Sequence, residues 1–497
     1  MKKLLFGLLT GLVLLAGAFL AGLGLGVIDT SSYAMLANVL FGLSGPPIEA
    51  EKVQARYRVP EGFALTLYAG DLPQARFLRF TPSGHLLVSR RHSGDIVRLS
   101  PDGDGDGQPD AQDILLDGLR QPQGIDVHGD WLYIAESHRV GRAPLDPVTG
   151  ELTGPYEPVV EGLTDNGNHP TKTLRFGPDG KLYLTQGSSC NVCTEEDPRR
   201  GSLMRFEADG TGGEIVASGL RNSVGFDWAP WSDSLYATDN GRDLLGDDFP
   251  PCELNHIEAG GFYGWPFFNG DNVPDPDMGT DPQAAERDPI APEFSFRAHN
   301  APLGITFPDT QGWPADFERS ALVALHGSWN RSSPDGYKVV SLHWTESGIE
   351  QRDFLTGFLW EGDIGGRPVD IAQGPDGAVY VSDDYAGAVY RIAPGKAGNI
   401  PVVAPTRQSS RLDQAPPAWL AGADFATMSA RGEALYAKYD CSQCHESDNG
   451  TASLENLSDR LGYAAVLDTL QAPQAPMPLY PLSEEERRQL AVFLLQR

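Results

Sequence analysis

Basic residues are scarce in this chain of 497 residues, which carries 38 Lys and Arg against 67 Asp and Glu and has a formal net charge of −29. A surface of this charge repels nucleic acid and anionic lipid headgroups, so the composition argues against nucleic acid as a partner. A neutral substrate or a basic redox partner fits the charge, and solubility alone also explains it. The chain also lacks a G-x-G-x-x-G motif that opens a helix after a strand, which argues against a nicotinamide or flavin cofactor on a Rossmann unit.

Long helical periodicities are scarce between residues 57 and 394, where a shorter pattern recurs. A turn of Gly, Pro and Asp precedes an apolar strand, a polar loop and a second strand that often ends in Arg and an aliphatic residue. The six copies begin at Ser83, Gly129, Gly177, Ser232, Arg319 and Gly374. Alternation of apolar and polar residues between turn formers predicts half-buried antiparallel strands, and six such units predict an all-β six-bladed β-propeller. We expect its functional residues in the loops at one mouth of the ring.

The N-terminus contains an uncharged run of 25 residues, from Leu4 to Ile28, behind Lys2 and Lys3. A helix of this length crosses a hydrocarbon layer of ~30 Å. The run is longer than the apolar region of an ordinary cleaved signal peptide and lacks a clear small-x-small cleavage site, which favours an uncleaved transmembrane anchor over a removed leader. Either alternative exports the rest of the chain. We therefore expect a periplasmic protein, anchored to the inner membrane by residues 1–30.

Composition divides the remaining chain into four parts. These are a linker at residues 31–56, the propeller at residues 57–394, a Pro- and Ala-rich linker at residues 395–424, and a small all-α domain at residues 425–497. In the last part, "LSEEERRQLAVFLLQR" predicts a helix with Ser483 as N-cap and Glu486 completing a capping box.

Cysteine is rare, with five residues in the chain, and two of them lie in the stretch "YDCSQCHES". This is a C-x-x-C-H site, in which Cys441 and Cys444 form thioethers to a haem and His445 is the proximal iron ligand. Met477 lies between prolines in a polar loop before the last helix, and we expect it to be the second axial ligand. A thioether ligand raises the potential of the iron and suits outer-sphere electron transfer. The segment resembles a class I cytochrome c.

Cys190 and Cys193 form a second C-x-x-C, but no histidine follows, which excludes haem attachment. A redox-active pair ordinarily opens a helix in a thioredoxin-like unit, whereas this pair lies in a loop of an exported propeller. We therefore expect a local disulfide that stiffens the rim of the site. Cys252 is left over and is expected to be a buried thiol.

The loops between the expected strands carry a family resemblance. Its stretches are "NHPTKTLRFGPDGKLYLTQG", "GLRNSVGFDW", "DNGRDLLGDDFPPCELNHIEAGGFYGWP", "HGSWNRSSPDGYKVV" and "GRPVDIAQGPDGAVYVSDD". On these stretches, residues 57–394 resemble the soluble quinoprotein glucose/sorbosone dehydrogenase family, six-bladed propellers that bind pyrroloquinoline quinone (PQQ) and calcium. The cysteine pair 190/193 is absent from the glucose-oxidising members, and "HGSWNR" is similar to the sorbosone-oxidising branch, so glucose is not assumed to be the substrate.

His169 lies in a loop before an expected strand, where a histidine is by default solvated or a turn contact. The resemblance implies that His169 is the catalytic base, which takes the proton of a sugar hydroxyl while hydride passes to PQQ. A histidine with its ordinary pKa of about 6.5 is a usable base at neutral pH. PQQ carries three carboxylates, so its pocket needs fixed cations and planar donors. The cofactor-binding residues that the resemblance implies are Gln121, Arg221, Asn222, Arg331, Lys338 and Arg367.

Two calcium sites are expected. The resemblance implies that main-chain oxygens of Gly241 and Arg242 hold a calcium ion that polarises the quinone, with Asp243, Asp247 and Asp248 adding negative charge. The second site needs no resemblance, since "DGDGDGQPDAQD" follows the spacing of an EF-hand-like loop with Asp102, Asp104, Asp106, Gln108, Asp110 and Asp113 at positions 1, 3, 5, 7, 9 and 12. The flanking sequence is strand-like and the last position is not Glu, so an acidic turn between blades is the alternative.

Together these features predict a quinohaemoprotein sugar dehydrogenase. The propeller would oxidise an aldose or a sorbosone-like sugar with PQQ, and the C-terminal haem c would relay the electrons to a soluble cytochrome or the respiratory chain. One alternative is a calcium-dependent hydrolase of the lactonase type, which would use water and acidic ligands and would not need a haem. The other is a non-catalytic propeller that docks a partner for the cytochrome.

Overall fold

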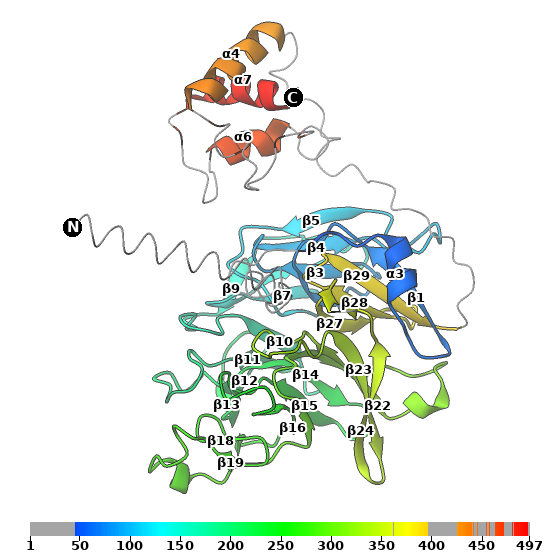
Figure 1. The fold of residues 1–497 in the computed structure, drawn as a ribbon, viewed down its shortest axis with the longest axis vertical. Helices are drawn as coiled ribbons and strands as arrows, with labels where there is room; N and C mark the ends of the chain where they lie inside the picture. The colour runs from blue at the N-terminus through cyan, green and yellow to red at the C-terminus, as the bar shows by residue number, and fades with distance from the viewer. Residues whose placement is uncertain are drawn as a thin grey trace, which may run out of the picture. The chain divides into compact units, whose positions relative to one another are not determined.

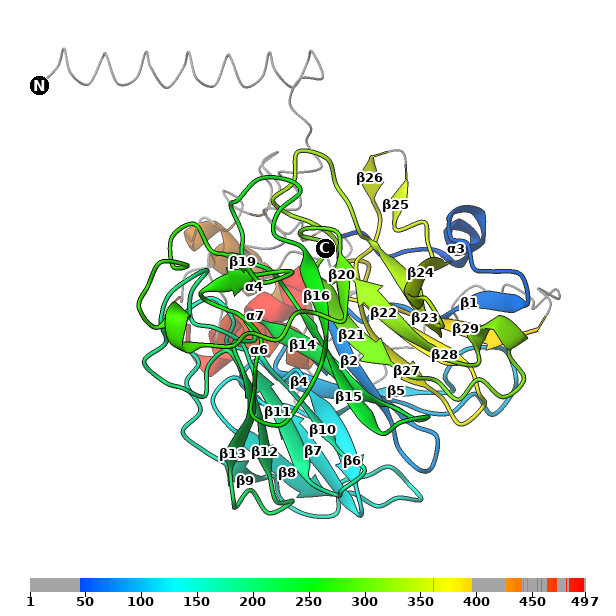
Figure 2. The ribbon, with the colours of Figure 1, turned by 90° about the horizontal axis from the view of Figure 1, so that it is seen from below.

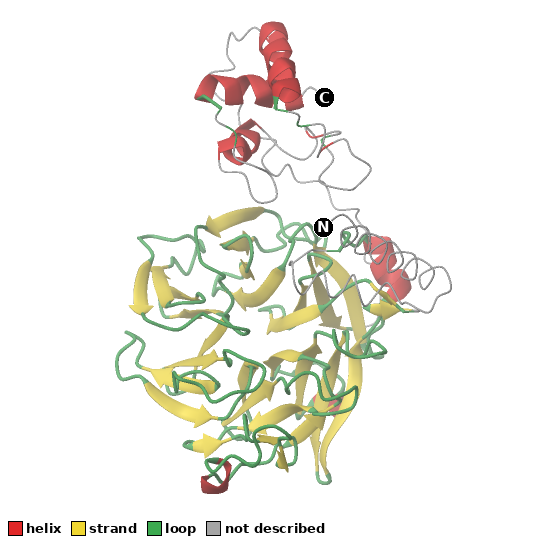
Figure 3. Cartoon of the chain, turned by 60° about the vertical axis from the view of Figure 1, so that its left-hand side comes forward, coloured by secondary structure: helices red, strands yellow, loops and turns green. Residues whose placement is uncertain are grey.

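The computed structural model describes residues 45–360 and 362–395, and from the C-terminal part residues 425–439, 441, 445, 454, 457, 463–471, 480 and 482–495. The chain forms two compact units, Met1–Ala404, which is described mainly as strands, and Pro405–Arg497, which is described as helices (Figure 3). The apolar run from Leu4 to Ile28 lies outside the described residues, as do Cys444 and Met477. No helix of the described residues is long and apolar enough to cross a membrane.

Within the described part of the first unit, six sheets of four or five strands form six blades, which confirms the six-bladed propeller (Figures 1 and 2). Neighbouring strands within each blade pair antiparallel, except in blade 3, where β17 pairs parallel with β13. The strands of blade 1 are β2 (Ala75–Phe80), β3 (Leu86–Arg90), β4 (Asp95–Leu99) and β5 (Gln112–Leu116); those of blade 2 are β6 (Ile125–His128), β7 (Trp131–Ala135), β8 (Val140–Pro144) and β9 (Glu157–Val160); those of blade 3 are β10 (Lys172–Phe176), β11 (Leu182–Gln186), β12 (Ser202–Phe206), β13 (Glu214–Ser218) and β17 (Gly261–Phe262).

The second half of the ring has the same plan, and blade 6 takes its fourth strand from the start of the chain. The strands of blade 4 are β14 (Ser223–Ala229), β15 (Ser234–Asp239), β16 (Cys252–His256) and β20 (Phe294–Phe296); those of blade 5 are β21 (Pro302–Thr306), β22 (Ser320–Leu325), β23 (Lys338–Thr345) and β24 (Gly348–Leu355); those of blade 6 are β27 (Pro368–Gln373), β28 (Val379–Asp383), β29 (Ala388–Pro394) and β1 (Phe63–Ala69). Short elements lie in the connections: α3 (Ala50–Arg56), the 3₁₀ turns Ala284–Glu286 and Ala315–Phe317, and the two-stranded pairs β18 (Phe268–Asn269) with β19 (Val273–Pro274) and β25 (Leu359–Trp360) with β26 (Asp363–Ile364).

The first strand of each blade faces the axis of the ring. The inner strands β2, β6, β10, β14, β21 and β27 each contact the inner strand of the next blade, and β27 contacts β2, which closes the circle. On the outside of blade 6, β1 pairs antiparallel with β29, so that Phe63 lies opposite Pro394. This pairing ties the first and last strands of the propeller together.

Buried aspartates on three inner strands join neighbouring blades. Each carboxylate accepts a hydrogen bond from a backbone N–H of the next blade along the chain: Asp126 from Phe176 (2.8 Å), Asp227 from Phe307 (2.9 Å) and Asp370 from Leu78 (2.9 Å). Arg79 and Arg175 form ion pairs with two of these carboxylates. The inner strands are thereby held relative to one another, which fixes where the loops at the mouth begin.

Most strands are buried on both faces, because each lies between two blades. In β3, Leu86 and Val88 pack with Tyr380 of blade 6, whereas Leu87 between them packs with Leu132 of blade 2. Side chains alternate across a strand, so one strand serves two interfaces. The sequence pattern predicted half-buried strands; β22, buried along its whole length, shows that the inner part of a blade has no solvent face.

The described residues of the second unit include three helices, α4 (Phe425–Lys438), α6 (Tyr463–Gln471) and α7 (Glu484–Leu495). They share an apolar core that includes Leu435 and Leu490. The backbone N–H of Ser483 donates to the Glu486 carboxylate (2.8 Å), and the Glu486 N–H donates to the Ser483 hydroxyl (3.2 Å). The expected capping box at the start of α7 is confirmed.

Candidate active site at the propeller mouth

Several residues predicted to carry the chemistry meet at one mouth of the propeller. The first two strands of a blade are antiparallel, so the loop before the first and the loop after the second lie at the same end. His169 comes shortly before β10, Arg221 and Asn222 come directly before β14, and Arg367 comes directly before β27. The ring therefore brings residues of blades 3, 4 and 6 to one end of the axis.

His169 is anchored through one ring nitrogen. Its Nδ1 lies 2.9 Å from the carbonyl oxygen and 3.0 Å from the hydroxyl oxygen of Ser188. A carbonyl only accepts, so Nδ1 carries the hydrogen and the lone pair of the neutral ring lies on Nε2. Burial lowers the pKa of His169 to about 3, and the guanidinium groups of Arg221, Arg200 and Arg91 act in the same direction. The ring is therefore neutral at physiological pH and offers Nε2 as a base.

Asn222 lies beside His169 because Gly187 leaves room for both. A Cβ on Gly187 would come within 2.5 Å of the Asn222 side-chain oxygen and 2.8 Å of the His169 Cβ. A larger residue would have to displace one of these groups. The structure thus brings the predicted base and the predicted cofactor-binding amide together.

Buried carboxylates hold the loops that carry the arginines. Asp239, the last residue of β15, accepts the backbone N–H groups of Arg221 (2.9 Å) and Asn222 (2.6 Å). Asp383, the last residue of β28, accepts the backbone N–H of Arg367 (2.9 Å). Burial raises the pKa of both carboxyl groups. Each loop is therefore fixed by a strand of its own blade.

The guanidinium group of Arg221 is buried and bonded on every side. Its Nε and Nη2 donate to Asn191, at the carbonyl oxygen (3.0 Å) and at Oδ1 (2.9 Å). Its Nη1 donates to the carbonyl oxygens of Asn240 (3.1 Å) and Gly241 (2.9 Å), and Nη2 also pairs with Asp243 (2.9 Å). This network gives Arg221 one defined position at the mouth.

A second network joins blades 1, 5 and 6. The carboxylate of Asp384 accepts hydrogen bonds from Arg76 (2.7 Å) and from Nε2 of His326 (2.9 Å). Arg367 donates to the carbonyl oxygens of His326 (3.2 Å) and Gly327 (3.2 Å). Burial lowers the pKa of His326 to about 4, so this ring is also neutral at physiological pH. The predicted cofactor-binding Arg367 is thus part of a connected cluster at the mouth.

Two arginines near His169 have no ion-pair partner within the part of the chain that the structure describes. These are Arg91, which follows β3, and Arg200. The Nε atoms of both side chains are buried without a hydrogen-bond partner, and the same holds for the Nε atom of Arg76. A buried cation is costly unless negative charge compensates it. The free donors on these side chains fit a bound anion with several oxygen atoms, such as the tricarboxylate PQQ.

Three other residues predicted to bind the cofactor lie differently. The side-chain oxygen of Gln121 is 3.5 Å from Nη2 of Arg91, so Gln121 stands beside the arginines. Arg331 instead pairs with Asp248 (3.2 Å), and Lys338 pairs with a carboxylate of the outer strand β24 (2.6 Å). The structure therefore places Gln121 at the mouth and gives Arg331 and Lys338 counter-ions of their own.

The loop predicted to hold calcium through its main chain is already well bonded. The Gly241 carbonyl accepts a hydrogen bond from Arg221, and the Arg242 side chain pairs with Asp275 (2.7 Å). The acids that follow have partners as well: Asn330 for Asp243, Ser332 for Asp247 and Arg331 for Asp248. The Gly241 oxygen retains a second lone pair that could accept a cation, and calcium binding by Gly241 and Arg242 stays a prediction.

The acidic loop between β4 and β5 brings part of its predicted set together. One carboxylate oxygen from each of Asp102, Asp104 and Asp110 lies within 4.8 Å of the other two. Asp106 instead caps the backbone N–H of Gln108 (2.8 Å). Asp113, expected at position 12, pairs with Arg98 (3.1 Å), because it belongs to strand β5 and faces its neighbour in the sheet. Calcium binding at this loop stays a prediction.

Part of the haem motif is described in the second unit. The backbone N–H of His445 donates to the Cys441 carbonyl (3.1 Å), which holds the two residues close together. Cys441 packs against the apolar core of the unit. These positions fit a haem attached at the edge of that core. Cys444 and Met477 lie outside the described residues, and their roles stay predictions.

Sequence reasoning missed Arg91, Arg200 and the pair of His326 with Asp384. Arg91 follows β3, His326 follows β22 and Asp384 follows β28, so each occupies the first position after the second strand of its blade. That shared position is the signal that could have found them, because it always lies at the same mouth as the loop before the first strand. Arg200 carries no such signal.

These observations define a six-bladed propeller whose mouth holds a neutral histidine among buried arginines. Residues 57–250 and 268–394 match the family model described as TrAA12-like, and the chain belongs to that family. Residues 427–494 match the model described as cytochrome C oxidase, cbb3-type, subunit III. The resemblance to a PQQ-dependent sugar dehydrogenase propeller joined to a cytochrome c domain is thereby confirmed.

Named relatives agree with this assignment. The aldose sugar dehydrogenase of Escherichia coli is 26% identical over 356 residues, which cover 64% of this chain and 89% of that protein. The pyrroloquinoline quinone-dependent pyranose dehydrogenase of Coprinopsis cinerea is 26% identical over 425 residues, which cover 71% of this chain and 56% of that protein. The calcium structure of a family AA12 carbohydrate-active enzyme from Trichoderma reesei superposes with a TM-score of 0.60 at 21% identity, over 68% of this chain and 97% of that one, which shows a common fold.

Proposed function

We propose that the propeller is a PQQ-dependent dehydrogenase that oxidises an aldose or a sorbosone-like sugar, and that the C-terminal unit receives the electrons. The observation that carries the proposal is His169, held neutral with its hydrogen on Nδ1, in the positive field of buried arginines. The named relatives are an aldose sugar dehydrogenase and a PQQ-dependent pyranose dehydrogenase, which supports sugar as the substrate class. A lactonase-type hydrolase would instead gather acidic metal ligands where this mouth gathers arginines.

His169 acts as the base of the oxidation. Its Nε2 takes the proton of a sugar hydroxyl while hydride leaves the carbon that bears this hydroxyl, so that carbon loses two electrons and becomes a carbonyl. The Ser188 carbonyl keeps the hydrogen on Nδ1, and the lone pair therefore stays on Nε2. When bound, PQQ supplies the ortho-quinone that accepts the hydride.

A pKa near 3 makes His169 a weak base, and the reaction tolerates this. The hydroxyl proton becomes more acidic as hydride departs from its carbon, so a base that is always unprotonated is sufficient. The arginines that lower the pKa of His169 also favour the bound carboxylates. One set of charges thus serves both cofactor binding and the state of the base.

The remaining predicted residues hold the cofactor and its metal. Arg221, Asn222 and Arg367 have fixed positions at the mouth, and Arg91 and Arg200 have unused donors for carboxylate oxygens. Calcium would be held by main-chain oxygens at Gly241 and Arg242 and would act as a Lewis acid.

The C-terminal unit is proposed to be the electron acceptor of the propeller. Cys441 and Cys444 would attach haem c, and His445 and Met477 would bind its iron. The haem would supply a one-electron carrier between the propeller and a soluble cytochrome or the respiratory chain. We further propose that the protein works in the periplasm, with residues 1–30 as its inner-membrane anchor; a disulfide and a thioether-linked haem both suit that compartment.

The test uses apoprotein of the full chain, a panel of aldoses and ketoaldehydes, and an artificial dye acceptor. Dye reduction that requires both PQQ and sugar supports the proposal, and reduction of the haem by sugar without dye supports the relay. Lactone hydrolysis without PQQ would establish the hydrolase instead. Absence of PQQ binding and of any turnover would leave the docking propeller as the better account.

A further inference from the structure

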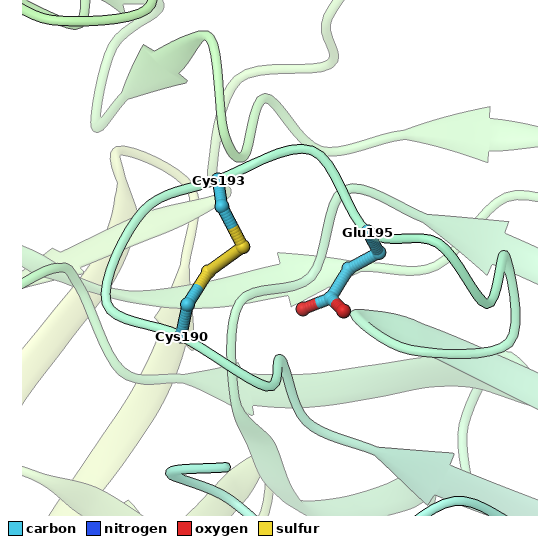
Figure 4. A group of neighbouring side chains, drawn as sticks. All are labelled: Cys190, Cys193 and Glu195. Atoms are coloured by element: carbon cyan, nitrogen blue, oxygen red, sulfur yellow. A yellow bond between two sulfur atoms is a disulfide. The ribbon is translucent and has the colours of Figure 1, made fainter. Parts of the chain in front are cut away.

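One loop at the mouth contacts both the predicted base and the principal arginine. The loop runs from Ser188 to Glu195 and carries the disulfide between Cys190 and Cys193, whose Cα atoms are 6.2 Å apart (Figure 4). The expected local disulfide is confirmed. It closes a ring of four residues, so it constrains only its own loop.

The N-terminal side of the loop holds His169. Ser188 offers its carbonyl oxygen and hydroxyl to Nδ1, and its hydroxyl also donates to the carbonyl oxygen of Cys190 (2.7 Å). The Ser189 carbonyl accepts the backbone N–H of Asn168, the residue before His169 (2.9 Å). The position and the tautomer of the base therefore depend on the path of the chain into the disulfide.

Asn191, one of the two residues between the cysteines, holds Arg221. Asn191 accepts hydrogen bonds from this arginine at its carbonyl oxygen (3.0 Å) and at Oδ1 (2.9 Å), and its Oδ1 also accepts the backbone N–H of Asp243 (2.8 Å). The Asn191 carbonyl additionally accepts the indole N–H of Trp265 (3.2 Å). A carbonyl and a side-chain oxygen of one residue can serve all these donors only while its backbone is held in one conformation.

Glu195 closes the loop a second time. Its side chain points toward the disulfide (Figure 4), and its carboxylate accepts the backbone N–H (2.6 Å) and the hydroxyl (2.8 Å) of Ser189. The two sulfurs and this carboxylate lie within 4.8 Å of one another, but a disulfide offers no thiolate, so the oxidised group is not a metal site. The arrangement serves to hold the loop.

We propose that Cys190 and Cys193 are positioning residues. Their disulfide holds one loop rigid, and this loop carries both Ser188, which sets the tautomer of His169, and Asn191, which orients Arg221. The inference rests on the proposed function. Loss of the disulfide frees the Asn191 backbone, so both contacts loosen together. Misplacement of this kind lowers the rate without removing a reacting group.

The primary test compares a double variant, Cys190→Ser with Cys193→Ser, with Thr194→Ala, which changes an exposed residue of the same loop and retains the disulfide. We expect kcat to fall about tenfold or more in the double variant, and the dissociation constant of PQQ from apoprotein, measured by fluorescence, to rise about tenfold. The acid limb of kcat/KM should move upward in pH, since a loosened His169 regains an ordinary pKa. Thr194→Ala should match the wild type. Unchanged kcat, PQQ affinity and pH profile in the double variant would overturn the inference.

Hydrogen exchange of the apoprotein gives a readout that needs no turnover. We expect faster exchange in segments 165–172 and 186–189 of the double variant, because the Asn168 N–H donates to the Ser189 carbonyl (2.9 Å) and the Ser188 N–H donates to the Arg221 carbonyl (2.7 Å). Exchange equal to that of the wild type would count against the loop as a support. This measurement also distinguishes failure of the proposed function from failure of the inference. A wild type that never reduces dye refutes the proposed function, and the exchange result still decides whether the disulfide supports the loop.

If the double variant does not fold, native apoprotein can be treated before PQQ is added. A phosphine reduces the disulfide with two electrons and two protons to two thiols, and iodoacetamide alkylates them with loss of iodide. Cys252 is 2% exposed and stays protected. Weaker PQQ binding by protein alkylated at both cysteines supports the inference. Binding as tight as that of untreated protein, with alkylation shown by mass spectrometry, would overturn it.

Discussion

The two histidines at the mouth are anchored in opposite ways. His169, on the side of blades 3 and 4, bonds through Nδ1 to the Ser188 carbonyl and hydroxyl, and its Nε2 has no hydrogen-bond partner among the described residues. His326, on the side of blades 5, 6 and 1, bonds through Nε2 to the Asp384 carboxylate, which also pairs with Arg76. The first arrangement leaves the outer ring nitrogen available to a substrate, whereas the second uses it in a structural network.

Charge does not distinguish the two rings. Burial lowers the pKa of His169 to about 3 and that of His326 to about 4, so both are neutral at physiological pH. Their hydrogen-bond partners make the difference, because a carbonyl fixes the hydrogen on one nitrogen and a carboxylate fixes it on the other. The side of the mouth that can act as a base is therefore decided by which ring nitrogen is bonded to an oxygen of the protein: Nδ1 in His169 and Nε2 in His326.

The largest expected effect separates the two histidines directly. In His169→Gln, kcat for PQQ-dependent dye reduction should fall by about 10²–10⁴-fold, because the amide can still donate to Ser188 but cannot take a proton. In His326→Gln, which retains a donor for Asp384, the loss should stay below about tenfold. Both rates are measured at saturating PQQ and sugar. Equal losses in the two variants would show that the comparison assigns the base wrongly.

Arg221→Met should damage both binding and folding. The substitution leaves the Asp243 carboxylate without its ion-pair partner and removes one donor from each acceptor on Asn191, so we expect a loss of about 3 kcal/mol in the free energy of unfolding, together with weaker binding of PQQ. Urea unfolding and a fluorescence titration with PQQ measure the two effects. An unfolding free energy equal to that of the wild type would mean that the network around Arg221 contributes nothing to stability.

Arg91→Met should separate these two effects. Arg91 has no ion-pair partner among the described residues, and its Nε is buried without an acceptor. Its removal should weaken PQQ binding by about tenfold to a hundredfold, while the melting temperature stays the same or rises, because no carboxylate is left behind. The same titration and a thermal melt check this. Loss of stability without loss of affinity would show that Arg91 serves the fold and not a bound anion.

Gly187→Ala tests the packing on the side of His169 alone. The new methyl group would meet the Asn222 oxygen at 2.5 Å and the His169 Cβ at 2.8 Å, so we expect kcat to fall about tenfold through displacement of the base. Gly70→Ala is the matched control, since a Cβ there meets nothing within 4 Å. A variant at 187 as active as this control would show that the loop adjusts without moving His169.

The sequence could predict the propeller because its strands repeat, and the repeat also places some of the site. Arg120, Arg221 and Arg367 stand at equivalent points of blades 2, 4 and 6, where "GLRQ", "GLRN" and "GGRP" precede an inner strand. The backbone N–H of each arginine donates to a carboxylate at or just after the end of the second strand of its blade. These carboxylates are Glu136 for Arg120, Asp239 for Arg221 and Asp383 for Arg367. The position of each arginine along its blade can therefore be predicted from the spacing of the sequence repeat alone.

The burial and the ion-pair partner of each arginine side chain cannot be predicted in this way. The side chain of Arg120 is 62% exposed and pairs with Asp165, whereas that of Arg221 is 5% exposed because Asn191 and Asp243 surround it. These partners come from loops of another blade or from farther along the chain, so no local pattern announces them. The same reason explains Arg331 and Lys338, for which the sequence could not show the carboxylates of other segments that neutralise them.

The smallest expected effect is the response of the rate to acid. The folded pKa of His169, about 3, lies below its ordinary value, so the base stays unprotonated as the pH falls and is lost only near the folded pKa. Between pH 8 and pH 5, kcat/KM for sugar should therefore change by no more than about twofold. Steady-state rates across this range, with PQQ at saturation and a dye whose own reduction does not depend on pH, measure the profile.

A fall in kcat/KM with an apparent pKa near 6.5 would contradict the expected flat pH profile. Such an acid limb would mean that the pKa of His169 is not kept low in the enzyme with cofactor bound, although burial and the charges of Arg221, Arg200 and Arg91 lower it in the free protein. The two causes can be told apart with Arg91→Met, which removes one cation and leaves the burial of the ring in place. If burial dominates, the limb of this variant stays where the wild type has it, and the Ser188 carbonyl behind the ring remains sufficient to explain why His169 acts as a base and His326 does not.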